Sequence, residues 1–419
     1  MSAQPHLAGS LDPTFGDSGK FVPDFPGAEL LSVRALKTAT DGKIYFAGVY
    51  SSVGFDKYML GRLGADGAPD LTFGIGGVVT DSFEEHTDLK VSSILLQDDG
   101  KILLLGSVYL GRLSALARYN HNGTLDVGFG TGGKTIIDSA DAVSLDLQDQ
   151  DSKTNAGGTS APAQLLPDGK ILLCSYQTSV QPYQGRIYRL QSNGALDTSF
   201  NGVGYIVVSV PDGSGSTVYI RNVLVQADGR YLACGNYKSA KLAFVARYTP
   251  DGSLDQSFGD KGFVSVESDS GKLMRFDDMA LQPNQRILAT GTTLTEFFEG
   301  VMVSLEPDGS PNIQFNSARP LYTRLDNKQT EWGNAVLQAD GKILVSGAIE
   351  NQDVDLYDAV LARYDFNGTL DPAFNVTGWL RTGFSADNQS VAMTLQRDGK
   401  ILIAAMDKDS RPVILRYLP

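Results

Sequence analysis

Histidine, cysteine and tryptophan are scarce in this sequence of 419 residues, which has three, two and two of them respectively. The histidines, His6, His86 and His121, fall at unrelated positions of the repeat that the chain contains. A Ser-His-Asp triad needs a histidine held within reach of its serine, and a zinc site needs closely spaced Cys and His ligands. Neither pattern is present, which argues against a triad hydrolase and against a zinc protein.

Long apolar runs are missing too: none approaches the length of about 20 residues that a membrane-spanning helix needs. The first residues, MSAQPHLAGS, lack the basic and apolar segments of a signal peptide. We therefore expect no membrane insertion, and a protein that is cytoplasmic or exported by a route independent of such a signal. Basic residues are in deficit, with a net charge of −13. This acidity argues against a nucleic-acid partner and permits divalent cations.

The two cysteines, Cys174 and Cys234, lie 60 residues apart at the same place in adjacent repeats. A disulfide or a shared metal is one interpretation. Two small buried thiols are the other, which we favour, because equivalent atoms on adjacent repeats usually exceed the roughly 7 Å Cα separation that a disulfide spans.

Two short motifs recur seven times along the chain. The first is a turn, usually Asp-Gly-Lys, followed by an apolar run, as in DGKIYFAG from residue 41 and DGKILVSG from residue 340. The second is Leu-Asp-x-x-Phe, whose aspartate positions (Asn312 in the fifth copy) are separated by 58, 56, 71, 58, 57 and 59 residues. Self-similarity at such a period indicates a repeat architecture.

Each repeat contains four apolar stretches that predict short strands. Asp-Gly between the first two is the strongest short signal for a hairpin, with both central residues at positive φ. The second stretch is apolar on both faces, as in KILLLG from residue 101, so its sheet should pack between two neighbours. That position is typical of a blade in a β-propeller.

The two chain ends share one repeat between them. The sequence opens on the end of a repeat, LDPTFGDSGKFVPDF from residue 11, and finishes with PVILRYLP, which lacks a fourth strand. Joining the ends completes a seventh blade and removes an open sheet edge. The sequence therefore predicts an all-β fold, a single seven-bladed β-propeller over residues 1–419 with four antiparallel strands per blade. Residues near Lys20 to Phe25 should close the ring as the outer strand of the C-terminal blade.

The strings DGKIL, LARYN, G-x-L-D-x-x-F-G and the Gly-Gly that follows resemble the bacterial delta-60 repeat family over essentially the whole chain. The resemblance implies a β-propeller. It carries with it no general activity and no catalytic residues, so it implies a fold rather than a function. Many members of that family occur in exported proteins, which the N-terminus here does not match.

An arginine precedes the motif aspartate by eight residues in six copies, which predicts structural ion pairs. The pairs are Arg62–Asp70, Arg118–Asp126, Arg189–Asp197, Arg247–Asp255, Arg363–Asp371 and, through ring closure, Arg416–Asp12. The fifth copy has Ser304 and Asn312, so both charges are missing together, as expected if one alone would be a costly unpaired charge. The alternative is that these arginine or aspartate residues form a row of catalytic groups. Near-copies around a ring are a poor design for one active site, so we assign no catalytic residue.

Three adjacent blades place Asn222, Asp278 and Asn334 near the start of their inner strands, eight residues before the basic turn residue. At the channel mouth these oxygens, joined by Asp277, could bind a divalent cation such as calcium. The arrangement is similar in outline to calcium-dependent propeller lactonases. The plainer interpretation is that polar residues belong at a wet channel mouth. The other blades have Val33 (assuming a one-residue insertion), Ser93, Pro162 and Ala392 at this position.

The Asp-Gly turns are uniform at one end of the ring, whereas the loops at the other end vary. An aspartate-rich insertion spans residues 139–161. Aromatic residues crowd the loops between second and third strands and would suit a protein or carbohydrate partner, or form small cores under each loop. They are Tyr50, Phe55, Tyr109, Tyr176, Tyr183, Tyr237, Phe297, Phe298 and Tyr357.

This asymmetry between the two ends predicts a non-enzymatic binding scaffold, monomeric and of unknown ligand, that uses the variable loops and the channel mouth. Two alternatives stay open: a calcium-dependent hydrolase or lactonase with its site at the channel mouth, and a carbohydrate-binding lectin.

Overall fold

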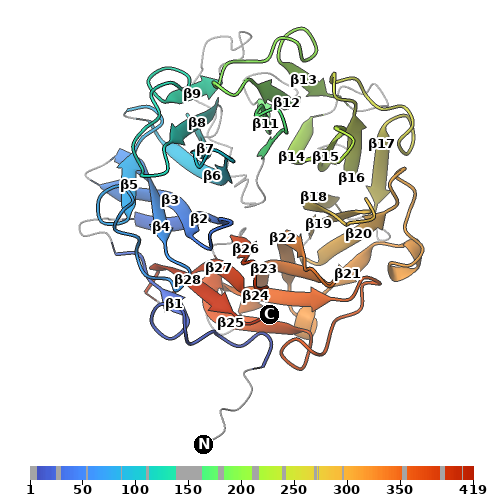
Figure 1. Ribbon diagram of the computed structural model, residues 1–419. Helices are drawn as coiled ribbons and strands as arrows, with labels where there is room; N and C mark the ends of the chain where they lie inside the picture. Colours follow the sequence, from blue (N-terminus) through green and yellow to red (C-terminus); the bar gives the residue numbers. More distant parts are fainter. Residues whose placement is uncertain are drawn as a thin grey trace, which may run out of the picture.

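Seven blades of β-sheet surround a common axis (Figure 1), as the repeat predicts. The computed structural model describes residues 7–24, 30–52, 55–85, 87–109, 113–137, 163–177, 184–209, 217–237, 242–268, 271, 273–294, 297–351, 356–386, 392–407 and 409–419. The aspartate-rich insertion 139–161 lies outside these residues.

Each blade has four strands, which in blades 1 to 6 run from the axis outwards in chain order; in blade 7 the outermost strand is the N-terminal β1. Blade 1 consists of β2 (Leu30–Thr38), β3 (Ile44–Ser52), β4 (Phe55–Leu63) and β5 (Val78–Asp81). Blade 2 consists of β6 (Leu89–Leu96), β7 (Ile102–Val108), β8 (Leu113–Tyr119) and β9 (Lys134–Ile137). Blade 3 consists of β10 (Ala163–Leu165), β11 (Ile171–Gln177), β12 (Gln184–Leu190) and β13 (Tyr205–Val208). Blade 4 consists of β14 (Val218–Val225), β15 (Tyr231–Tyr237), β16 (Leu242–Tyr248) and β17 (Phe263–Glu267). Blade 5 consists of β18 (Leu273–Leu281), β19 (Ile287–Leu294), β20 (Gly300–Leu305) and β21 (Leu321–Thr323). Blade 6 consists of β22 (Thr330–Leu337), β23 (Ile343–Asn351), β24 (Leu356–Tyr364) and β25 (Trp379–Ala386). Blade 7 consists of β26 (Met393–Leu395), β27 (Ile401–Met406), β28 (Pro412–Tyr417) and β1 (Lys20–Phe21).

All the strand pairs within the described blades are antiparallel. Blades 1 to 5 are separate four-stranded sheets, whereas blades 6 and 7 are joined through one pairing, between Ser385 of β25 and Met406 of β27. Two short 3₁₀ helices, η1 (Asn316–Ala318) and η2 (Leu325–Asn327), lie in the fifth blade's corner and in the connection to the sixth blade. In the described residues, no helix has the length and apolar character needed to cross a membrane.

The N-terminal segment completes the seventh blade, next to the C-terminal strand in Figure 1. Lys20 pairs with Leu415, and Phe21 with Ile414. Before this strand, the Asp12 N–H donates to the Arg416 carbonyl at 2.8 Å. The strand is shorter than the expected Lys20 to Phe25: it ends at Phe21, two residues before Pro23, whose ring nitrogen has no N–H to donate. Phe25 lies outside the described residues.

The Asp-Gly turns form hairpins by a different geometry from the one expected. Gly42 adopts φ 88°, but Asp41 is not among the residues with positive φ. Instead the Asp41 carboxylate accepts the Lys43 N–H at 3.1 Å, which is the local bond that makes Asp favourable in turns. The motif therefore specifies the hairpin through a side-chain cap and one left-handed residue, not two.

The apolar core consists of seven clusters of buried residues, one at each seam between neighbouring blades of the described structure. The second strand contributes to both of its seams: in β11, Leu173 faces blade 2 while Leu172 and Cys174 face blade 4. Cys174 and Cys234 are both buried free thiols. They belong to different seams, because Cys234 faces blade 5, and this explains why equivalent positions do not form a disulfide.

Ring closure predicts equal importance for two phenylalanines at opposite ends of the chain. Phe15 and Phe129 are the same motif residue in blades 7 and 2, and both are fully buried. We expect Phe15→Ala and Phe129→Ala each to lower the free energy of unfolding by roughly 3–5 kcal/mol, the cost of a large cavity. Chemical denaturation measures both. A loss for Phe15→Ala that is a small fraction of the loss for Phe129→Ala would contradict an integral N-terminal segment.

Candidate functional site

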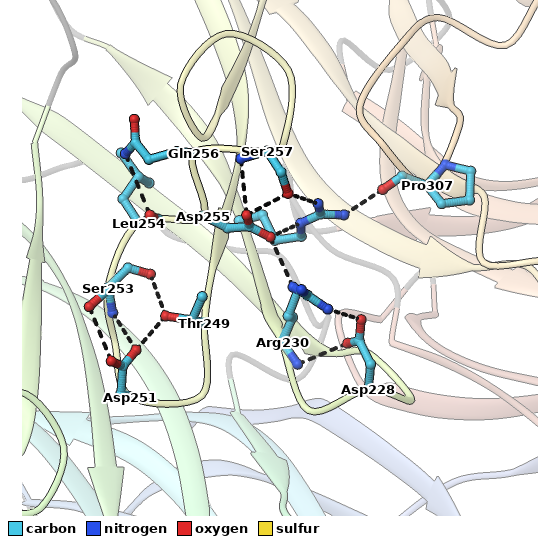
Figure 2. Close-up of polar contacts among 11 residues, drawn as sticks. Asp228, Arg230, Thr249, Asp251, Ser253, Leu254, Asp255, Gln256, Ser257 and Pro307 are labelled. Atoms are coloured by element: carbon cyan, nitrogen blue, oxygen red, sulfur yellow. Dashed lines mark hydrogen bonds and ion pairs between the residues drawn. The ribbon is translucent and has the colours of Figure 1, made fainter.

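The corner after each third strand is the most repeated polar arrangement of the molecule. Figure 2 shows it in blade 4, where Asp255 accepts hydrogen bonds from Ser257 through both the backbone N–H, at 3.0 Å, and the hydroxyl, at 2.7 Å. Arg247 Nε donates to the other carboxylate oxygen of Asp255 at 2.8 Å. The eight-residue spacing produces this contact because Arg247 is the last residue but one of the third strand and the backbone then turns back: the Asp255 N–H donates to the Arg247 carbonyl at 2.9 Å.

The ion pair is present in all six blades that carry both charges. The Nε to Oδ2 distance is 2.7–2.9 Å in each of them, for Arg62–Asp70, Arg118–Asp126, Arg189–Asp197, Arg247–Asp255, Arg363–Asp371 and Arg416–Asp12. The Arg416–Asp12 contact, at 2.9 Å, lacks hydrogen-bond alignment between these two atoms and is an ion pair by proximity alone.

A second cation reaches the same carboxylate from the Asp-Gly-Lys turn. In Figure 2, Arg230 lies between Asp228 of its own turn and Asp255, with its Nε 2.9 Å from Asp255. The turn lysines contact the corner aspartate of their own blade likewise, as Lys342 does with Asp371 at 2.7 Å. In each of the six charged blades, the turn and the corner are therefore connected through one carboxylate. Spacing within a single motif does not reveal this contact.

The same arginine also connects its blade to the next. Arg189 Nη1 donates to the Pro250 carbonyl of blade 4 at 2.7 Å, and Arg247 donates to the Pro307 carbonyl of blade 5. The guanidinium carbon of Arg247 stands 4.6 Å from the ring centre of Phe258, the motif phenylalanine of its own corner, and Arg189 stands the same distance from Phe200. Charge, stacking and an inter-blade hydrogen bond thus come from one side chain.

These contacts keep the corner carboxylates ionised. Burial alone would raise the pKa of Asp255, but hydrogen bonds from Ser257 and the charge of Arg247 outweigh burial and lower that pKa to about 2. The pKa values of Asp12, Asp70 and Asp197 are also lowered to about 2. The charge of each corner carboxylate is thus balanced by the arginine that precedes it by eight residues or, for Asp12, by Arg416.

The fifth blade replaces the charged corner with a neutral one. Asn312 Nδ2 donates to the Ser304 hydroxyl at 3.0 Å, and both side chains are buried. The turn cation follows the change: Arg286 contacts Glu306 at 2.9 Å and the Gln314 amide oxygen at 2.8 Å. Removal of both corner charges therefore leaves no buried charge without a partner at this corner.

The three axial residues expected at a wet channel mouth are buried instead. Asn222, Asp278 and Asn334 are 2%, 6% and 3% exposed. Asn222 Nδ2 donates to Asp278 Oδ1 at 2.5 Å, and the Ala335 N–H donates to Asp278 Oδ2 at 2.9 Å, so this carboxylate connects blades 4, 5 and 6. Asn334 instead faces its own second strand, with Nδ2 3.5 Å from the Ser346 hydroxyl.

A β-bulge recurs in the inner strands directly before the position of Asn222 and Asp278. It also shows which residue of the first blade is equivalent to them. The inner strands shift register between Ile220 and Asn222, and between Phe276 and Asp278. The first blade has the same bulge, between Val33 and Ala35. Its equivalent residue is thus Ala35, not Val33, and no insertion is needed.

Next to Asp278, charged side chains form a chain of ion pairs across three blades. Arg221 of blade 4 lies 3.5 Å from Asp277, Arg275 donates to Asp277 at 2.8 Å, and Arg275 lies 3.5 Å from Glu331 of blade 6. Burial raises the pKa values of Asp278 and Glu331 to about 7. Asp277 is thus engaged by two arginines.

This donor set does not fit calcium. Three N–H groups, from Asn222, Met279 and Ala335, point at the two oxygens of Asp278, where a cation would have to approach. Calcium needs six to eight oxygen ligands. Across the described ranges, no group of three or more His, Cys, Asp or Glu side chains is arranged to hold a metal ion.

The loop end of blades 5 and 6 carries an exposed aromatic residue. Phe297, between β19 and β20, is 54% exposed, and the Arg324 guanidinium lies 5.9 Å from its ring centre. Tyr237, expected in an equivalent loop, is instead buried and stacks on Phe244 at 4.9 Å. The aromatic loop residues thus divide between core and surface. The side chains of Phe55, Tyr176 and Tyr183 lie outside what the structure describes.

Comparison with known families supports a β-propeller repeat protein. The family model "Domain of unknown function (DUF5122) beta-propeller" matches residues 39–73, 97–129, 166–200, 226–258 and 338–374. Each match runs from the Asp-Gly turn region to the motif phenylalanine, so it covers the turn and the corner. The fifth blade, with its neutral corner, and the divided seventh blade are not matched. No curated protein matches the chain.

Solved structures show likeness of fold at low sequence identity. Polysaccharide lyase Uly1 is 12% identical, with a TM-score of 0.49 over 96% of this chain and 92% of its own. The β-propeller domain of the Trilobed protease from Pyrococcus furiosus is 8% identical, with a TM-score of 0.47 over 93% of this chain and 94% of its own. The extracellular domain of the putative one component system BT4673 from B. thetaiotaomicron is 10% identical, with a TM-score of 0.45. The match covers 95% of this chain but only 40% of the chain in that structure.

A double-mutant cycle tests whether the corner charges act as a pair. Arg247→Ser and Asp255→Asn recreate, one at a time, the Ser304 and Asn312 of the fifth blade. Each single change should lower the free energy of unfolding by roughly 2–4 kcal/mol, because it leaves partly buried charge uncompensated. The double variant should lose about 1–3 kcal/mol less than the sum of the singles, measured by chemical denaturation. Strictly additive losses would mean that the two charges do not depend on each other.

Proposed function

We propose that this protein is a non-enzymatic binding scaffold whose partner, a protein, contacts the loop end of blades 5 and 6. The observation that carries the proposal is the exposed Phe297, with the Arg324 guanidinium 5.9 Å from the centre of its ring. Aromatic and arginine side chains are the residue types that dominate the energy of protein interfaces.

Hydrogen bonds from two blades hold the segments around Phe297. The Phe298 N–H donates to the Gln329 amide oxygen at 3.1 Å, and the Thr330 N–H donates to the Phe298 carbonyl at 3.2 Å. Arg324 Nη2 donates to the Asn327 carbonyl at 2.7 Å. A surface that is ordered before binding loses less conformational entropy on contact with a partner. This favours a recognition role for the exposed ring.

The opposite end of the ring, which carries the Asp-Gly turns and the corners, stabilises the fold. Its turns and corners repeat the same ion pairs from blade to blade and connect each blade to the next. Such uniformity supports a scaffold in which the variable loops carry the specific contacts. The calcium-dependent hydrolase is the weaker alternative, because Asp278 accepts three N–H bonds.

Selection of ligands against the purified full-length protein tests this proposal. A random peptide library and a glycan array serve as probes. Selected peptides should bind Phe297→Ala and Arg324→Ala about tenfold more weakly, a loss of about 1.4 kcal/mol. Phe366→Ala is the matched control, because Phe366 is 59% exposed in a turn at the opposite end of the ring.

The other outcomes separate the alternatives. Peptides that bind Phe297→Ala normally and lose affinity for Phe366→Ala would contradict the assignment of the loop end. Binding of glycans in place of peptides would favour the lectin. Turnover of a lactone that requires calcium and is lost in Asp278→Asn would overturn the non-enzymatic proposal.

A further inference from the structure

Asp278 differs from the other buried aspartates of the described structure in having no cation as a partner. Each of the others forms an ion pair with an arginine; they are Asp12, Asp197, Asp255, Asp277, Asp358 and Asp371. Within the described part of the chain, no arginine, lysine or histidine forms an ion pair with Asp278. Its carboxyl group is nevertheless buried where blades 4, 5 and 6 meet, and a buried charge without a counter-charge is costly.

Three nitrogen atoms surround the carboxyl group of Asp278. The Met279 nitrogen lies 2.7 Å from Oδ1, and the Ala335 nitrogen lies 2.9 Å from Oδ2. Asn222 Nδ2 is closer still, at 2.5 Å from Oδ1. That separation is shorter than the roughly 2.7–3.2 Å of an N–H donor and lies within the roughly 2.5–3.0 Å of an O–H donor. The contact between Asn222 and Asp278 therefore accommodates a proton on the carboxyl group.

The side-chain amide of Asn222 can face Asp278 with either of its two polar atoms. The other amide atom, Oδ1, is buried and has no hydrogen-bond partner in the described residues, so no second contact fixes the orientation. A half-turn about the Cβ–Cγ bond exchanges the acceptor Oδ1 with the donor Nδ2. A carboxylate only accepts hydrogen bonds, whereas a protonated carboxyl group also donates one. The charge of Asp278 therefore decides which atom of Asn222 faces it.

We propose that Asp278 and Asn222 form a proton-operated latch between blades 4, 5 and 6, which is more stable when Asp278 is neutral. In the neutral state, the Asp278 hydroxyl accepts the Met279 N–H and donates to Asn222 Oδ1, while the carbonyl oxygen accepts the Ala335 N–H. When the proton leaves to solvent, the Asn222 amide turns over and donates from Nδ2. A negative charge without a counter-charge then remains at the junction of the blades, and any opening that exposes it to water becomes easier.

The charged groups around the latch balance each other only when Asp278 is neutral. They lie on the three inner strands that meet there and are Arg221 of β14, Arg275 and Asp277 of β18, and Glu331 of β22. Arg221 and Arg275 contact Asp277, and Arg275 also contacts Glu331. Two cations thus face two anions, and an ionised Asp278 would add a third anion.

The second strands place two uncharged residues opposite the latch. Cys234 lies opposite Asn222, and burial raises the pKa of its thiol, while Thr290 lies opposite Asp278. Burial raises the pKa of Asp278 to about 7, and the neighbouring charge of Asp277 adds to this rise, although the three N–H contacts oppose it. Burial also raises the pKa of Glu331 to about 7, so a test has to separate these two groups.

Carbon-13 NMR of the full-length protein, labelled at its aspartate carboxyl carbons, tests the proposal. The Asp278 signal, assigned by its loss in Asp278→Asn, should titrate with a midpoint near neutral pH. The side-chain amide signals of Asn222 should shift with the same midpoint, since its two polar atoms exchange places. Glu331→Gln is the matched control and should leave both titrations in place. An Asp278 carboxyl group that is ionised throughout the range from about pH 5 to 8, or a titration that Asn222 does not follow, would overturn the latch.

The pH dependence of stability is a second, independent readout. The pKa of Asp278 lies above its ordinary value of 3.8, so the folded protein binds this proton more tightly than the unfolded chain. The stability that the proton contributes is thus present below about pH 4 and is lost as the pH rises through 7. At about pH 5.5, unfolding of the wild type should release about one proton more than unfolding of Asp278→Asn. Equal proton release would contradict the latch. If Asp278→Asn does not fold, the wild-type spectrum decides, because the absence of any aspartate signal that titrates near pH 7 would overturn the proposal.

Discussion

The aspartate carboxylate at the corner of six of the seven blades is the group on which the ring depends. It is held by the arginine of the third strand and by the cation of the Asp-Gly-Lys turn, and that arginine stacks on the buried motif phenylalanine and donates to the next blade. Salt bridges on protein surfaces contribute little, but the arginine and aspartate of these corners are mostly buried, and in five of the six charged corners the arginine Nε donates a hydrogen bond to the aspartate. Because one side chain serves its own corner and the neighbouring blade, the fold within a blade and the order of blades are specified together.

The fifth blade shows what this constraint permits. Ser304 and Asn312 retain the backbone path of the corner: the Asn312 N–H still donates to the Ser304 carbonyl at 3.0 Å. The turn cation, Arg286, is paired with Glu306 instead. A corner can therefore be neutral or charged, but its charges have to change together, because a buried charge without a partner is costly. At the loop end, by contrast, residues such as Phe297 and Arg324 differ between blades.

The repeat made the fold and the corner pairs predictable, because seven copies in one chain reveal which residues vary together. Arg247 and Asp255 could be paired from sequence since Ser304 and Asn312 lose both charges at once. The inter-blade bond from Arg247 to Pro307 could not, because the partner is a backbone carbonyl with no side-chain signature. Asn222 and Asp278 were correctly placed on adjacent inner strands, but the expectation of a wet channel mouth was wrong, since they bond to each other across the blades. The burial of Asn222 and Asp278 depends on how the inner strands pack around the axis, and the local sequence pattern of a single strand does not predict that packing.

The proton uptake that accompanies acid unfolding tests the role of the corner carboxylates most directly. The pKa of Asp255 is about 2 in the folded protein against an ordinary value of 3.8, so the unfolded chain binds the proton more tightly. The stability that Asp255 contributes is thus present above about pH 4 and is lost as the pH falls towards 2. Near pH 3, unfolding of the Arg247→Ser, Asp255→Asn double variant should take up about 0.8 of a proton less than unfolding of the wild type, as measured by the pH dependence of the free energy of unfolding. An unchanged proton uptake would contradict the account, because the corner carboxylate would then be no better held in the fold than in the open chain.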